Sequence, residues 1–191
     1  MQESILISLI FIFMYFLICF NNNTQYIETN IGTKFFIRSD DKTNDKTLLL
    51  SKIIENMFKL KNYLYININN YSEFTQYIKQ LNNNLDENKT IIYETEPNSD
   101  LTSYSVNKGE EISFCLRSKK NDSIHELNLL TYVALHEMAH IACPEIGHGP
   151  LFKKIFKFLT EIAIEIGIYN KQDYNNEPIE YCGMILSSSI V

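Results

Sequence analysis

Clustered basic residues are missing from this sequence. Its 17 lysines and arginines are scattered, and pairs such as Lys119-Lys120 and Lys153-Lys154 do not extend into longer runs. With 23 acidic residues, the chain carries a net charge of −6. A protein that binds nucleic acid through its phosphates normally presents a basic patch or stripe. The composition therefore argues against intrinsic nucleic-acid binding.

Closely spaced cysteines are missing as well. The four cysteines are Cys19, Cys115, Cys143 and Cys182, and no two of them form a C-x-x-C pair. Such a distribution does not predict a disulfide framework in a chain of this length. Cys143 is an alternative metal ligand because it lies three residues after His140. However, a helix that continues to Cys143 already uses its metal-facing side for two histidines.

Histidine is scarce, yet three of the four histidines lie between positions 136 and 148. His136, Glu137 and His140 form the pattern H-E-x-x-H. Residues four apart lie one helical turn above each other, so both imidazoles can reach one cation. Apolar residues at helical spacing predict a buried helix that begins at Asp122 or Ser123 and ends near position 141. Histidines satisfied by core hydrogen bonds are the alternative, but the spacing favours a metal site.

The third metal ligand has two candidates. His148 lies in a turn bracketed by Gly147 and Pro150, where the chain can reverse and direct the side chain back to the metal. Glu161 lies on the next predicted helix, at a separation from His140 that zinc peptidases with a glutamate ligand use. We predict His148, because the turn brings it in without requiring a particular helix crossing.

The predicted function is zinc-dependent hydrolysis of peptide bonds by an endopeptidase, with a protein or peptide as substrate. Zinc would activate a water molecule, and Glu137 would act as the general base. Two alternatives stay open. One is a membrane-tethered metal-binding domain without catalysis, and the other is a zinc hydrolase of a non-peptide amide or ester.

The N-terminus contains a long apolar run. Residues 4–20 carry no charge and are just long enough to span a bilayer as a helix. No basic residue precedes them and no small-residue cleavage site follows, so we predict an uncleaved anchor rather than a signal peptide. Lys34 and Arg38 follow the run and place the folded domain in the cytoplasm. The predicted protein is therefore a single-pass membrane protein, with a secreted or lumenal protein as the alternative.

The predicted organisation has three parts: an anchor or signal peptide at 1–23, a tether at 24–32 and one domain at 33–191. The fold class is α+β. Helices are expected over residues 47–65 and 72–81 and for about eighteen residues from Pro150, besides the H-E-x-x-H helix. Strands are expected at 34–38, 91–94, 103–106 and 111–117, with a hairpin between the last two.

Two further expectations concern single side chains. His125 lies about three helical turns before His136, too far along the axis to share a metal, and is expected on the surface. The C-terminal tail is aromatic and should fold back on the core. Tyr169, Tyr174 and Tyr181 are packing residues in the simplest interpretation, and each is a candidate donor to a tetrahedral intermediate.

The segment around the motif resembles the SprT-like and WLM (Wss1-like) metallopeptidases. The resemblance rests on residues 136–140, HEMAH, and on the segment from Gly147 to Phe152, which matches Gly-His-Gly-Pro-x-Phe. In those families this segment supplies the third zinc ligand and opens the next helix. The resemblance implies that His136, His140 and His148 bind zinc and that Glu137 is the general base.

A wider stretch, residues 102–184, is similar to uncharacterised predicted metallopeptidases of large DNA viruses and some unicellular eukaryotes. The resemblance implies a minimal zincin-like domain, in which a small sheet packs on the H-E-x-x-H helix. Characterised relatives repair DNA–protein crosslinks and carry extra segments that bind DNA or ubiquitin. This chain is acidic and ends soon after its last motif, so the peptidase chemistry is expected here without the crosslink-repair role.

Overall fold

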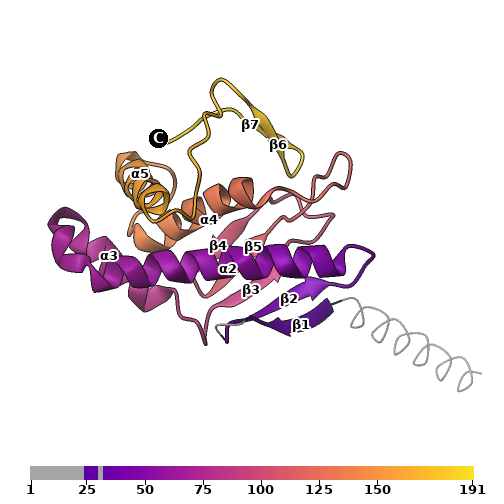
Figure 1. The fold of residues 1–191 in the computed structure, drawn as a ribbon, viewed down its shortest axis with the longest axis horizontal. Helices are drawn as coiled ribbons and strands as arrows, with labels where there is room; N and C mark the ends of the chain where they lie inside the picture. Colours follow the sequence, from indigo (N-terminus) through magenta and orange to yellow (C-terminus); the bar gives the residue numbers. More distant parts are fainter. Residues whose placement is uncertain (1–23, 30–31) are drawn as a thin grey trace, which may run out of the picture.

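A computed structural model describes residues 24–29 and 32–191 of the chain (Figure 1). In chain order its elements are β1 (Thr24–Glu28), β2 (Lys34–Arg38), α2 (Thr43–Ile66), η1 (Ile68–Asn70), η2 (Ser72–Phe74), α3 (Thr75–Asn84), β3 (Ile91–Glu94), β4 (Tyr104–Val106), β5 (Glu111–Phe114), α4 (Leu127–Ala142), α5 (Pro150–Glu165), β6 (Ile179–Tyr181) and β7 (Met184–Leu186). The predicted α+β class is confirmed.

The main sheet is mixed and has five strands in the order β1-β2-β3-β5-β4. Strands β2, β3 and β5 run parallel, whereas β1 and β4 are antiparallel to their neighbours. Parallel neighbours need a long crossover, and α2 with α3 provides it between β2 and β3. The order leaves β4 at one edge of the sheet, next to the helix that carries H-E-x-x-H.

One face of the sheet is covered by helices. In β2, Phe35 and Ile37 are fully buried while Lys34 and Phe36 are exposed, as expected for a strand that is buried on one face only. Figure 1 shows α2 and α4 crossing the sheet side by side, and the two helices are in contact. Helix α4 also packs against α3 and α5.

Helix α4 lies in the interior of the domain. Twelve of its 16 residues are buried, because it is enclosed by three other helices and the edge of the sheet. A helix that is apolar around most of its circumference can only be stable in such a position. Its buried polar side chains are therefore costly unless they have partners, which makes Glu137 a functional candidate on physical grounds alone.

Three sequence-based predictions need correction. Residues 24–28, expected in a tether, form β1 and pair with β2 along its whole length. Helix α4 begins at Leu127 rather than at Asp122 or Ser123. His125, expected on the surface, is only 8% exposed and accepts a hydrogen bond from the backbone N–H of Cys182. His125 is buried by a tertiary contact, because the C-terminal hairpin β6–β7 packs over it.

The predicted membrane localisation is wrong. Among residues 24–29 and 32–191, no helix is both long and apolar enough to cross a membrane. Helix α2 has 24 residues but carries charges such as Lys52 and Glu55, and α4 and α5 have 16 residues each. A membrane-spanning helix needs roughly 20 predominantly apolar residues. The run at 4–20, on which the single-pass prediction rested, lies outside the described residues.

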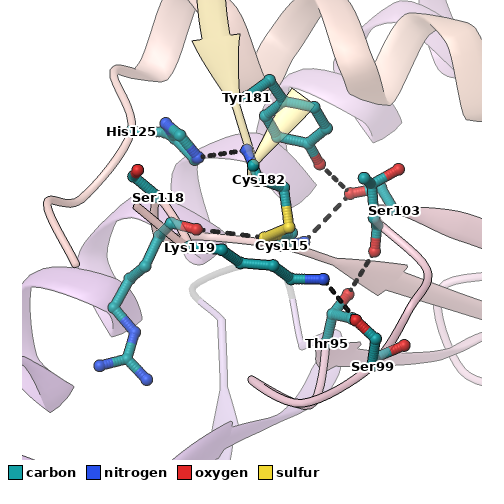
Figure 2. The surroundings of a disulfide bond; sticks show 12 residues. Thr95, Ser99, Ser103, Cys115, Ser118, Lys119, His125, Tyr181 and Cys182 are labelled. Carbon is teal, nitrogen blue, oxygen red and sulfur yellow. Dashed lines mark hydrogen bonds between the residues drawn. A yellow bond between two sulfur atoms is a disulfide. The ribbon is translucent and has the colours of Figure 1, made fainter. Parts of the chain in front are cut away.

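A disulfide joins Cys115, just after β5, to Cys182 in the β6–β7 turn (Figure 2). The sequence had not predicted a disulfide, because 67 positions separate the two cysteines and nothing local pairs them. Their Cα atoms lie 6.1 Å apart, within the usual range for a bridge. The bond ties the C-terminal hairpin to the sheet.

A buried charge cluster joins β2, α2 and β3. The Lys46 side chain is fully buried, and its ammonium lies 2.7 Å from Asp40 and 2.8 Å from Glu94. Arg117 approaches the same two carboxylates at 3.3 and 3.6 Å. Burial raises the pKa of Asp40, but the hydrogen bond from Lys46 and the nearby positive charges outweigh it. The net pKa of Asp40 is therefore lowered.

Acid is expected to remove the stability that Asp40 contributes. A carboxyl with a lowered folded-state pKa stabilises the fold above its unfolded pKa of about 3.9, and this contribution is lost as the pH falls through the lower value. The free energy of unfolding should be higher for wild type than for Asp40→Asn at neutral pH, and the difference should shrink below about pH 4. Exposed Asp41→Asn is the control. An Asp40→Asn difference that does not change with pH would contradict the expectation.

Candidate metal centre

The two histidines of H-E-x-x-H point to one place from adjacent turns of α4. Their Nε2 atoms lie 3.2 Å apart. Met138 and Ala139, between them in sequence, are fully buried and pack α4 into the core. The helix therefore cannot rotate, and both imidazoles are held at its one solvent-accessible side, where His136 and His140 are partly exposed.

His148 joins them from the loop after α4. The helix ends when Cys143 adopts an extended conformation, and Gly147 then takes a φ of +83°, which favours glycine. Gly149 caps α5 and Pro150 is its first residue, as the turn prediction expected. His148 Nε2 lies 3.0 Å from the Nε2 atoms of both other histidines.

The three nitrogen atoms suit a metal ion as ligands. Nitrogen ligands about 2.0–2.1 Å from a tetrahedral ion lie roughly 3.3–3.4 Å apart, close to the spacings found here. Three neutral imidazoles that direct their Nε2 atoms at one point cannot all hydrogen-bond to one another, because each Nε2 is either a donor or an acceptor and at least two of the three are alike. Among the described residues, this cluster contains the three histidines and no carboxylate or cysteine. Imidazole sets of this kind suit zinc and related transition metals.

Phe152 orients all three rings. Its ring centroid lies 5.0 Å from that of His136, 4.3 Å from that of His140 and 4.8 Å from that of His148. Phe152 is on the first turn of α5 and only 2% exposed, so its own position is set by the core. An aromatic ring packed against all three imidazoles limits the rotamers that they can adopt.

Burial keeps the histidines of α4 uncharged. It lowers the pKa of His136 to about 3, and electrostatic interaction with the neighbouring His140 and His148 rings adds a smaller effect in the same direction. Burial likewise lowers the pKa of His140 to about 4, assisted by His148 and Lys108. The neutral imidazole is the form that binds metal, so the site is prepared for a cation at neutral pH.

Glu137 is a buried carboxyl beside the three histidines. It is only 4% exposed, and burial raises its pKa to about 7 even though the side chain and backbone of Ser105 act in the opposite direction. Ser105 lies on β4, so the edge strand and the carboxyl are in contact across the sheet–helix boundary. A carboxyl with a pKa near neutrality is suited to accept and return a proton.

An open cleft of about 740 Å³ gives access to this group of side chains. Its walls come from β4, α4, the loop after α4 and the β6–β7 hairpin, and include Ser105, Lys108, Tyr132, Val133, Ile146, Tyr181, Met184 and Leu186 besides the three histidines and Glu137. The cleft is largely apolar away from the histidines. This size and lining are typical of a binding site for an organic substrate.

Other side chains that the sequence singled out lie elsewhere. The Glu161 side chain is 55% exposed on α5 and pairs with Lys157 at 3.8 Å. Cys143 is a buried free thiol outside the histidine cluster. Tyr169 and Tyr174 are buried and pack around Tyr132. This burial confirms that the tail folds back on the core.

Of the three tail tyrosines, Tyr181 is the one that lines the cleft. Its hydroxyl forms a hydrogen bond with the Ser103 hydroxyl, and its pKa is raised by burial (Figure 2). Sequence reasoning missed Ser103, Ser105 and Lys108, which all belong to the β4–β5 region. The sequence predicts a hairpin between residues 103–106 and 111–117, but nothing local indicates that α4 lies against its turn.

Fold and site together define the class: an α+β domain in which three histidines that could hold a metal ion face a substrate-sized cleft. No family model matches the sequence. The chain is 40% identical to "Uncharacterized protein R325" of Acanthamoeba polyphaga mimivirus over 171 residues, which cover 89% of this chain and 86% of that protein. The chain belongs to the same family as this mimivirus protein.

More distant similarities were also found. "Uncharacterized protein 136R" of Invertebrate iridescent virus 6 is 34% identical over 52% of this chain and 53% of its own length. Among solved structures, a Wss1 mutant from Saccharomyces cerevisiae matches with a TM-score of 0.47 and 16% identity, over 68% of this chain and 87% of that chain. Another structure of Wss1 from the same yeast matches with a TM-score of 0.37 and 19% identity, over 51% of this chain and 81% of that chain.

Proposed function

We propose that the protein is a zinc-dependent peptidase. His136, His140 and His148 would hold the metal ion, and Glu137 would be the catalytic base. The observation that carries the proposal is the convergence of three Nε2 atoms, 3.0–3.2 Å apart, beside a buried carboxyl at one open cleft. A catalytic zinc site keeps three protein ligands and leaves a position for water or substrate.

The chain's own residues account for the proton transfers. When bound, zinc lowers the pKa of water to about 7 and polarises a carbonyl group. Glu137 accepts a proton from the attacking water on its carboxylate and later delivers it to the leaving amine nitrogen. Its raised pKa, which burial causes, brings it near the operating pH and makes both directions of transfer accessible.

The edge strand supports a peptide as the substrate. Strand β4 pairs with β5 on one side and is the last strand of the sheet, so its other side is open to an added strand. Tyr104 and Ser105 of β4 line the cleft that contains Glu137. An extended peptide that pairs with β4 would therefore present its carbonyl groups along the metal centre. This arrangement favours peptides over small esters.

His148→Ala tests the metal site. The full chain is expected to bind about one zinc ion, and the variant should bind zinc about 100-fold more weakly, because two ligands remain on α4. Metal content after dialysis and chelator competition measure both quantities.

Glu161→Ala is the matched control for that experiment, because this glutamate was the rival ligand and its side chain is solvent-exposed. It should bind zinc as wild type does. A folded wild-type chain without zinc would refute the peptidase proposal. Full zinc binding without cleavage of any peptide would instead favour a metal-binding domain without catalysis.

A further inference from the structure

Lys108 has an unusual backbone conformation in the turn between β4 and β5. Asn107 and Lys108 have φ values of 46° and 59°, in the left-handed region, and Gly109 follows at 109°. Asparagine and glycine tolerate this region, but a lysine there is strained. The surroundings must compensate for the strain, and the Lys108 side chain shows how.

The Lys108 ammonium donates hydrogen bonds to three backbone carbonyl groups. They belong to His140 at 3.0 Å, Cys143 at 2.6 Å and Glu145 at 2.9 Å. An ammonium has three donors, so all of them are used here. The carbonyls at the end of α4 have no partner within the helix, and a positive charge there also interacts favourably with the helix dipole.

These three carbonyls belong to the metal-binding segments. His140 supplies one metal-directed nitrogen, and Glu145 lies in the loop that carries His148. Residues 144–148 are exposed, and their N–H and carbonyl groups make no backbone–backbone hydrogen bond within the described chain. Apart from the contacts of the His148 ring, the polar contact that holds this loop in the described chain is the bond from Lys108 to the Glu145 carbonyl.

Close packing of the neighbouring residue Gly109 holds Lys108 in this position. A Cβ atom on Gly109 would lie 3.0 Å from the Asn84 carbonyl oxygen and 3.2 Å from Ile141 Cγ2. The turn therefore packs this closely against the ends of α3 and α4 because residue 109 has no side chain. The same turn directly follows β4, whose Ser105 contacts Glu137.

We propose that Lys108 is the positioning residue of the metal centre, a role that rests on the proposed zinc site. Its ammonium joins the end of α4 to the ligand loop and so holds His148 at the right distance from His136 and His140. Lys108 thereby also couples the substrate-binding edge of the sheet to the metal ligands.

The test compares zinc affinity and cobalt spectra of full-length variants. Lys108→Met keeps an unbranched side chain but removes the donors and the charge, and should weaken zinc binding about 10–100-fold. The visible d–d bands of the Co²⁺-loaded protein should shift or weaken, because the coordination geometry changes. Lys108→Arg keeps the charge and several donors and should recover most of the affinity. If Lys108→Met does not fold, Lys108→Gln takes its place in the test, and the same weaker zinc binding and changed cobalt spectrum are expected.

Lys119→Met is the matched control. Lys119 also donates to two loop carbonyls, those of Ser99 and Leu101, but away from the three histidines. It should leave the zinc affinity and the cobalt spectrum unchanged. Wild-type affinity and spectrum in folded Lys108→Met or Lys108→Gln would overturn the positioning role, as would an equal loss in Lys119→Met. A wild-type chain that binds no zinc would refute the underlying metal site as well, so the two failures are distinguishable.

Discussion

Replacement of Glu137 by glutamine is expected to lower kcat for peptide hydrolysis by roughly 10³-fold while zinc stays bound. Glutamine has nearly the same shape and can still interact with Ser105, so the fold and the three histidines should not move. It cannot accept a proton, however. A 10³-fold loss corresponds to about 4 kcal/mol in the activation barrier, which is within the range that a positioned general base supplies.

Zinc content and kcat must be measured on the same preparation for this prediction. Glu161→Gln is a suitable control, because it makes the same chemical change at an exposed position of α5. Wild-type turnover by Glu137→Gln would show that another group takes the proton. Loss of zinc in Glu137→Gln would show that the carboxyl supports the metal site rather than the proton transfer.

Removal of the Cys115–Cys182 disulfide is expected to destabilise the protein by about 4 kcal/mol, by the loop-entropy relation for a separation of 67 residues. The bond restrains the unfolded chain, and in the folded protein it holds the β6–β7 hairpin against the end of β5. For a chain of this size such a loss lowers Tm by roughly 8–16 °C. Thermal unfolding of the Cys115→Ser, Cys182→Ser double variant measures it.

The control is wild type unfolded with and without a dithiol reductant. The reductant should lower the wild-type Tm toward that of the double variant and leave the double variant unchanged. Backbone amides of Tyr181 and Met184 should also exchange hydrogen faster once the bond is absent, because both residues lie in the tethered hairpin. Alkylation of Cys115 or Cys182 in the unreduced protein would contradict the bond.

Local features of the sequence predicted that the three clustered histidines converge. The spacing of His136 and His140 places both imidazoles on one side of any α-helix, because 3.6 residues make one turn. Gly147 and Pro150 mark the turn that returns His148 to that side. The α+β class and most elements follow in the same way from hydrophobic periodicity, which depends on neighbours in sequence.

Tertiary structure decided everything that depends on contacts between distant segments. Three contacts of this kind join segments that are far apart along the chain. They are the Cys115–Cys182 disulfide, the packing of the C-terminal hairpin over His125, and the bonds from Lys108 to the three carbonyls. No local propensity encodes such pairs, since they form only when the sheet and helices pack and exclude alternatives. Short-range geometry thus brings the three candidate metal ligands together, whereas packing determines the groups that hold them in place.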